Sequence, residues 1–201
     1  FITPQILKKN RIAHRNSHLG KHLTLHPATK VFAEFDEEIN GWKGTPQALY
    51  LDTFQDRGIM FEGIYMPPDI VGLSIPFTGR RFTDFLKRIA HMSTFGIMIS
   101  DHSEGRLIRL PFAGYFYFYN MTQRDVNLFQ EAIAFLARIF LKGGAKKVIP
   151  VVKTDIQEFK TLRDVDHFAS LKLKASQLEV MAFHPLGTCR MGVDAKAGVC
   201  D

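Results

Sequence analysis

The chain has 201 residues, of which 46% are hydrophobic and 23% are charged, as in an ordinary folded domain with one hydrophobic core. Its formal net charge of +6 would suit an anionic partner, but zinc-finger spacings, basic helices and RNA-binding aromatic motifs are all missing, which argues against nucleic acid. Apolar runs of transmembrane length are missing too, and the two cysteines are too few for a disulfide framework.

The N-terminal stretch is expected to connect rather than to form a core. Residues 1–10 read as a short helix or turn with Pro4 near its start. Residues 12–26 are polar and basic, and four histidines recur in them every fourth residue: His14, His18, His22 and His26. Such spacing could align metal ligands on a helix, but Gly20 and the lack of carboxylates argue against a metal site.

Three strands are expected next. Residues 28–36 alternate in polarity, and residues 48–54 and 58–66 form two further strands around a tight turn at 55–57. The apolar loop 69–81 either covers a pocket or packs against the core.

The middle of the chain is predicted to contain a capped helix, a hairpin and an aromatic strand. Thr83 can cap a helix over 84–92, and residues 95–100 and 106–112 are spaced as the two arms of a hairpin. Residues 115–121 read Tyr-Phe-Tyr-Phe-Tyr-Asn-Met, so one face of this strand either lines a cavity or packs between sheet and helices.

Two helices have clear start signals. Thr122-x-x-Asp125 is a variant capping box, and the apolar spacing after it predicts a helix to Lys142, where two glycines stop it. A second helix begins with Thr161-x-x-Asp164 and ends near residue 174.

Short strands at 148–152 and 177–183 complete a set of six or seven strands and three main helices without strict β-α-β alternation. This order predicts the α+β class, with an antiparallel sheet of about six strands and helices packed on one face.

The segment after the last expected strand is the best candidate for chemistry. It reads His184-Pro185-Leu186-Gly187-Thr188-Cys189-Arg190-Met191-Gly192. Proline favours an extended His184, and Gly187 permits a tight turn or a close approach by another surface. A histidine on such a rigid turn suits a catalytic base that faces a flat ligand. The alternative is a histidine that makes only structural hydrogen bonds.

This nine-residue segment resembles the C-terminal signature of the glucose–methanol–choline (GMC) family of flavin-dependent oxidoreductases. The tail Gly198-Val199-Cys200-Asp201 is similar to the Gly-x-Val-Asp that follows it in the family. Near the other end, Thr3-Pro4-Gln5-Ile6-Leu7 resembles the family's Thr-Pro-x-Leu-Leu. The run Leu19-Gly20-Lys21-His22-Leu23, with His26-Pro27 behind it, resembles Gly-Arg-Asn-Leu followed by His-Pro. Asn10-Arg11 departs from the Ser-Gly that is usual in the family.

The resemblance implies a fragment of such an enzyme, with three parts: a connector from a missing FAD-binding domain (1–27), a substrate-binding domain (28–183) and the start of a C-terminal catalytic segment (184–201). His184 would accept the hydroxyl proton of an alcohol, and Pro185, Gly187 and Thr188 would face the flavin. The second catalytic His or Asn of the family falls beyond Asp201.

The resemblance also implies FAD as the cofactor. No Gly-x-Gly-x-x-Gly fingerprint occurs in the chain, so the main FAD site is expected outside it, and the fragment alone should neither hold flavin tightly nor turn over. The aromatic composition, Trp42-Lys43-Gly44 and Leu25-His26-Pro27 look most like the branch that acts on long-chain or bulky apolar alcohols. The positive net charge would also suit a membrane surface.

Two other functions compete with this interpretation. The residues His184, Cys189, Cys200 and Asp201 are donors that a metal could use, although their spacing matches no known ligand pattern. A basic binding module for anionic lipid or a partner protein would also explain the net charge. The carboxylates of Glu179, Glu158 and Asp155 are expected to be solvated surface groups.

Overall fold

A computed structural model describes residues 2–65 and 67–200, and the chain divides into two compact units. Unit 1 comprises residues 1–27, 100–125 and 182–201, and unit 2 comprises residues 28–99 and 126–181. The expected range 28–183 therefore contains a stretch, residues 100–125, that belongs to unit 1 with the two ends of the chain.

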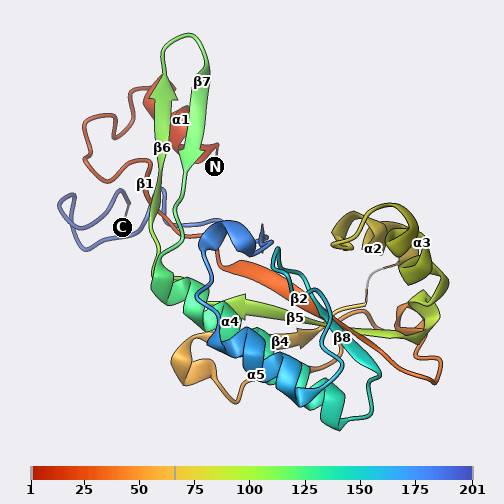
Figure 1. Ribbon diagram of the computed structural model, residues 1–201. Helices are drawn as coiled ribbons and strands as arrows, with labels where there is room; N and C mark the ends of the chain where they lie inside the picture. The colour runs from red at the N-terminus through yellow and green to blue at the C-terminus, as the bar shows by residue number, and fades with distance from the viewer. Residues whose placement is uncertain (1, 66, 201) are drawn as a thin grey trace. The chain divides into compact units, whose positions relative to one another are not determined.

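Unit 1 is built on a three-stranded antiparallel sheet in the order β1-β6-β7. Its elements, labelled in Figure 1, are α1 (Thr3–Lys9), β1 (Lys21–Leu23), β6 (Gly105–Leu110) and β7 (Gly114–Phe118). The short helix expected near the N-terminus is confirmed as α1. Phe116, Tyr117 and Phe118 of β7 are exposed, so the expectation that this aromatic strand packs between sheet and helices is wrong.

Unit 2 is built on an antiparallel sheet in the order β3-β4-β5-β2-β8, and β9 also pairs with β2. The strands are β2 (Pro27–Glu34), β3 (Tyr50–Leu51), β4 (Ile59–Gly63), β5 (Met92–Ile99), β8 (Lys147–Pro150) and β9 (Met181–Ala182). The helices are α2 (Pro68–Val71), α3 (Gly79–Lys87), α4 (Gln123–Lys142) and α5 (Leu162–Ser170). Short 3₁₀ turns occupy Gly41–Lys43, Gln55–Arg57, Gly72–Ser74, Ile89–His91 and Ala175–Gln177. The α+β class and the antiparallel sheet are confirmed.

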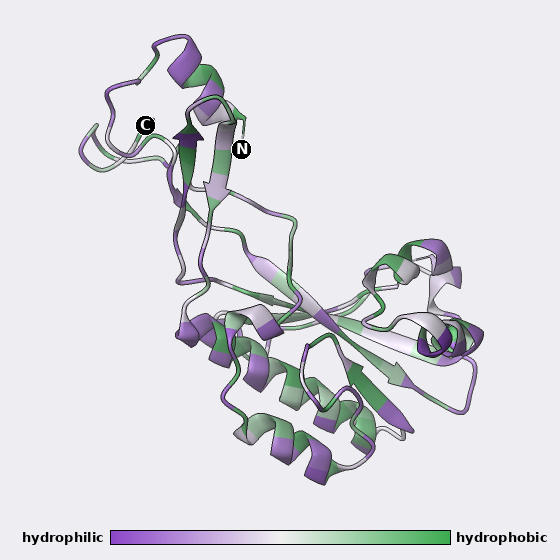
Figure 2. Ribbon diagram, turned by 45° about the horizontal axis from the view of Figure 1, so that its top comes forward, coloured by the Kyte–Doolittle hydropathy of each residue, from purple (hydrophilic) through white to green (hydrophobic). Residues whose placement is uncertain are grey.

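The central strand β2 is buried on both faces, because helices pack over each of them. Val31 lies opposite Phe95 of β5 and Pro150 of β8, and its side chain is fully buried. On this face α4 packs with Phe135, whose ring lies 5.4 Å from that of Phe61. Figures 1 and 2 show α4 and α5 side by side, with hydrophobic and hydrophilic residues alternating along both helices.

The opposite face carries a second, smaller apolar cluster. The ring of Phe32 meets that of Phe85 of α3 at 5.1 Å, edge to face. The loop 69–81 contributes Val71, Ile75 and Phe77 to the same cluster, so its apolar residues pack against the core. Helices thus pack on one face through α4 and α5, and α3 additionally occupies part of the other.

The carboxylate of Glu34, at the end of β2, is almost buried and bonds Arg88 at 2.8 Å and Lys147 at 3.2 Å. Burial opposes its ionisation, but the bonds to these two cations outweigh burial and lower the pKa of Glu34. The ion pairs let an acidic residue end a buried strand.

Three local expectations were wrong. Residues 95–100 and 106–112 do not form a hairpin, since β5 pairs with β2 and β4 whereas β6 pairs with β1 and β7. Helix α3 begins at Gly79 after Thr78, and Thr83 lies inside it with its hydroxyl on the Arg80 carbonyl at 2.8 Å. The strands expected at 48–54 and 177–183 are shorter in the structure, where they are β3 and β9.

Within the described residues, no helix combines the length and apolar character that crossing a membrane requires.

Candidate functional site

The sequence motifs at the two ends of the chain pair with each other in unit 1. The amide of Thr24 donates to the carbonyl of Leu186 at 3.1 Å, and the amide of Leu186 donates back to Thr24 at 3.0 Å. The amide of Gly20 donates to the carbonyl of Thr188 at 2.8 Å. The turn that follows His184 therefore lies against the residues on either side of β1, through an isolated antiparallel bridge at Thr24 and one further backbone bond at Gly20.

Gly187 makes this pairing possible. Its φ of +88° is in the left-handed region, and a Cβ there would lie 1.9 Å from the carbonyl oxygen of His22. A side chain larger than hydrogen is thus excluded by the backbone of the chain itself. The close approach expected at Gly187 exists, and its partner here is the peptide of His22.

His184 is exposed, and its ring lies against a single neighbouring ring. The centroids of His184 and His26 are 6.3 Å apart, with an angle of 72° between the ring planes. The imidazole of His184 is not enclosed in packed hydrocarbon, so it is free to exchange a proton with a small molecule.

The three residues expected to face a flavin differ in accessibility. Pro185 and Gly187 are half-buried, and the Thr188 side chain is buried with 6% of its surface exposed. Thr188 also uses its carbonyl to hold Gly20. Pro185 and the ring of His184 therefore offer more surface to a ligand than Thr188 does.

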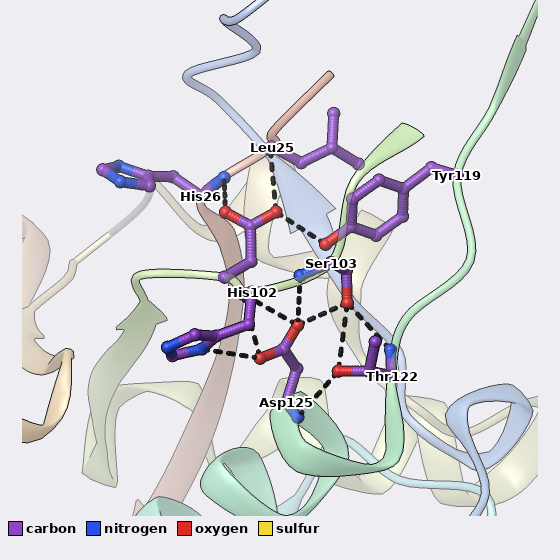
Figure 3. A network of polar contacts seen from close by, with 8 residues as sticks. Leu25, His26, His102, Ser103, Tyr119, Thr122 and Asp125 are labelled. Carbon is purple, nitrogen blue, oxygen red and sulfur yellow. Dashed lines mark hydrogen bonds and ion pairs between the residues drawn. The ribbon is translucent and has the colours of Figure 1, made fainter. Parts of the chain in front are cut away.

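The turn that carries His26 is held by a carboxylate that sequence reasoning missed. Asp101 accepts the amide of Leu25 at 3.1 Å and that of His26 at 3.2 Å. The hydroxyl of Tyr119 donates to the same carboxylate at 2.7 Å. Burial, with the negative Asp101 beside it, raises the pKa of Tyr119 and keeps the phenol protonated as a donor. Figure 3 shows the backbone nitrogens of Leu25 and His26 and the hydroxyl of Tyr119 directed at the same carboxylate group.

A second carboxylate, Asp125, organises the loop before β6. It accepts the amide of Ser103 at 2.9 Å, the amide of His102 at 3.1 Å and the hydroxyl of Ser103 (Figure 3). Burial opposes ionisation of Asp125, but the hydrogen bonds from Ser103 and His102 outweigh it and lower the pKa. Ser103 is fully buried and donates to the carboxylate, so this Ser-Asp-His set is structural and not nucleophilic.

The spacing Thr122-x-x-Asp125 predicted only a local capping role for Asp125. The Asp125 amide does reach the hydroxyl of Thr122, at 3.4 Å, as in a capping box. The carboxylate, however, turns to residues 102 and 103, and the hydroxyl of Ser103 accepts the Thr122 amide at 2.8 Å. Asp125 therefore does more than cap the start of α4, because its carboxylate bonds residues about 22 positions earlier in the chain.

The recurring histidines do not converge as ligands. His18 Nδ1 meets His22 Nε2 at 2.9 Å, and His22 Nδ1 meets Glu104 at 3.0 Å, so these rings use their nitrogens on protein partners. Throughout residues 2–65 and 67–200, no three His, Cys, Asp or Glu side chains are arranged to hold a metal ion.

Cys189 and Cys200, which belong to the other candidate set of metal ligands, lie in different surroundings. Cys200 is exposed and its thiol donates to the carbonyl of Cys189 at 3.2 Å, while burial raises the pKa of the Cys189 thiol. Asp201 lies outside the described residues.

The remaining carboxylates of interest lie in unit 2. Asp155 and Glu179 line a pocket of about 460 Å³, together with Lys153 and His167. Glu158 is bonded to Arg81 and Lys147 at 3.4 Å and 3.6 Å. Glu158 is thus an ion-paired group and not an isolated solvated one.

The chain is similar in sequence to proteins of one known family. Residues 117–201 match the family model described as GMC oxidoreductase. Over 195 residues the chain is 26% identical to an uncharacterized GMC-type oxidoreductase of Mycobacterium tuberculosis strain H37Rv, covering 96% of this chain and 30% of the relative. An uncharacterized GMC-type oxidoreductase of strain CDC 1551 / Oshkosh gives the same figures. The chain therefore spans 30% of the length of the curated relatives that it matches.

Proposed function

We propose that the chain, whose residues 117–201 match the GMC oxidoreductase family model, is the substrate-binding and catalytic-histidine part of an FAD-dependent enzyme that oxidises CH–OH donors. The family match supports an oxidoreductase role, and we add the alcohol substrate, the cofactor and the role of His184. The observation that carries the proposal is an exposed imidazole on a turn whose backbone is bonded on both sides of Gly187.

Alcohol oxidation needs a proton acceptor within hydrogen-bond distance of the hydroxyl group. A neutral imidazole serves this purpose near neutral pH, since its ordinary pKa is about 6.5. We assign this task to His184, which would take or orient the hydroxyl proton while the hydrogen on carbon leaves with its electron pair. The backbone bonds from Thr24 and Gly20 fix the turn, so the imidazole starts from a constant position.

FAD, when bound, would supply the acceptor for that hydride at N5 of its ring. The residues present fit one edge of such a ring, because His184 and Pro185 offer an exposed imidazole and a rigid, half-buried turn. The chain lacks the glycine fingerprint that cradles a pyrophosphate, so the main cofactor site would lie in the remainder of the polypeptide. That remainder would be the partner of this chain.

An apolar alcohol is the substrate class that we favour. The chain contains 18 phenylalanines and 5 tyrosines, and side chains of this kind suit an alkyl or aryl group.

The test uses the full-length, FAD-loaded enzyme and a panel of primary alcohols from 1-butanol to 1-hexadecanol, with benzyl alcohol. Flavin reduction is followed by its absorbance in a stopped-flow instrument. His184→Ala should slow reduction by about 100-fold or more, the scale of general base catalysis, with flavin content unchanged. His14→Ala, an exposed histidine of the same unit, is the control. Reduction at the wild-type rate would remove His184 from the mechanism.

A further inference from the structure

The backbone of His26 is held in an unfavourable conformation. Its φ is +45°, a region that few residues other than glycine occupy, and the next residue is Pro27. A residue before proline normally adopts an extended conformation. Such a geometry persists only when its surroundings fix it, and strained positions of this kind gather at functional sites.

The carboxylate of Asp101 holds the backbone of His26 in this conformation through hydrogen bonds. One carboxylate accepts two successive amides, those of Leu25 and His26, and also the hydroxyl of Tyr119. Hydrogen bonds to a charged acceptor are stronger than bonds between neutral groups, so three of them can offset the backbone strain at His26. The raised pKa of Tyr119 means that its hydroxyl remains a donor across the physiological range.

The result of this strain is the position of one ring. The imidazole of His26 lies edge to face with that of His184, 6.3 Å between centroids. Thr24 and Gly20 fix the backbone of the His184 turn, but the exposed imidazole itself has no hydrogen-bond partner among residues 2–65 and 67–200. The ring of His26 is thus the contact that limits how the His184 ring can rotate.

We propose that His26, held by Asp101 and Tyr119, is a positioning residue that orients the His184 imidazole for proton transfer. The inference rests on the proposed function of His184. Reactions of this kind lose about 10²-fold in rate when a reacting group moves by about 1 Å. Freed from its neighbour, His184 would spend most of its time in unproductive orientations, while the binding of the alcohol would be little affected.

The first experiment measures flavin reduction in the full-length, FAD-loaded enzyme with the same primary alcohols. His26→Asn removes the ring but keeps a residue that tolerates positive φ. It should lower the rate at saturating alcohol about 10- to 100-fold and change the half-saturating concentration less than about threefold. His26→Phe retains a ring and should stay within about threefold of the wild-type rate. His14→Ala should match the wild type.

Two more variants test the holding group. Asp101→Asn keeps one acceptor oxygen and places an amide nitrogen towards the donors, so it should lower the rate in the same direction. Tyr119→Phe removes only one donor and should have the smaller effect. If His26→Asn reduces its flavin as fast as the wild type, or if only the half-saturating concentration changes, His26 does not orient His184.

A second measurement separates this inference from the proposed function. Diethylpyrocarbonate modifies neutral imidazoles, and peptide mass spectrometry reports the modification of His184 without any substrate. His26→Asn should increase the rate of His184 modification severalfold, and His26→Phe should not. If His184 is modified faster in His26→Asn but no alcohol reduces the flavin of the wild type, the contact between the two rings is supported and the proposed alcohol oxidation is refuted. An unchanged modification rate, in an enzyme that alcohols do reduce, would refute the positioning role alone.

Discussion

Replacement of Asp125 by asparagine should release the loop that precedes β6. The Oδ2 atom of Asp125 accepts both the amide and the hydroxyl of Ser103, and Oδ1 accepts from His102. Asparagine leaves one oxygen and turns an NH₂ group towards the donors. At least two hydrogen bonds to a charged acceptor are lost, at about 1.5–3 kcal/mol each, so local opening should become easier by about 3–6 kcal/mol.

Hydrogen–deuterium exchange of peptides over residues 100–106 measures this release in the full-length protein. A loss of about 3 kcal/mol corresponds to exchange that is more than about 100-fold faster. Asp166→Asn, an exposed carboxylate bonded to Arg138, is the matched control and should leave the exchange unchanged. Exchange of the Asp125→Asn loop within twofold of the wild type would refute the account.

The effect should also depend on pH in one direction. Since the pKa of Asp125 is lowered in the folded protein, its stabilisation is complete above the unfolded value of about 3.9 and is lost as the pH falls through the folded value. The difference between wild type and Asp125→Asn should therefore be full at pH 7 and shrink below about pH 4. A difference that stayed constant down to pH 2 would show that the carboxylate charge contributes nothing.

Two further predictions concern Gly187 and Lys30. Gly187→Ala should lower both the melting temperature in a thermal-shift assay and the rate of flavin reduction, because its Cβ would lie 1.9 Å from the carbonyl oxygen of His22. The control is Gly44→Ala, whose Cβ would meet no atom within 4 Å and which should leave the melting temperature unchanged. An unchanged melting temperature for Gly187→Ala would show that the turn can relax away from His22. Burial lowers the pKa of Lys30 to about 8, so urea denaturation should show stability rising from about pH 8 to pH 10.5 as the unfolded state binds the extra proton. Lys30→Met should flatten that rise and add up to about 3 kcal/mol at pH 7, and a rise that persists in Lys30→Met would assign it to another group.

The parts of the fold that follow from local chemistry could be predicted from the sequence. Thr161 and Asp164 form the reciprocal capping box that their spacing indicates, and α5 begins where they place it. The apolar spacing after Thr122 likewise predicted α4 to its last residue, Lys142. These signals act within one or two turns of a helix, so no knowledge of distant residues is needed.

The hairpin predicted over residues 95–112 is wrong because local signals do not determine which strands pair. Residues 101–105 have the length and the glycine of a hairpin loop, but Asp125 binds the amides of His102 and Ser103 and directs the chain to another sheet. The same segment begins with Asp101, which fixes His26 from far along the chain. Both carboxylates act through long-range hydrogen bonds to backbone amides, for which a single sequence carries no periodic signal.

The pairing of the two sequence motifs depends on what lies between them. Closing a long loop costs entropy, and the bonds between Thr24 and Leu186 alone are too few to offset it. Unit 2 lowers that cost, because its first and last segments are themselves bonded, with the hydroxyl of Thr29 on the carbonyl of Glu179 at 2.8 Å. The chain thus enters and leaves unit 2 at neighbouring positions. A substitution that unfolds unit 2 should therefore raise the entropic cost of the pairing between Thr24 and Leu186.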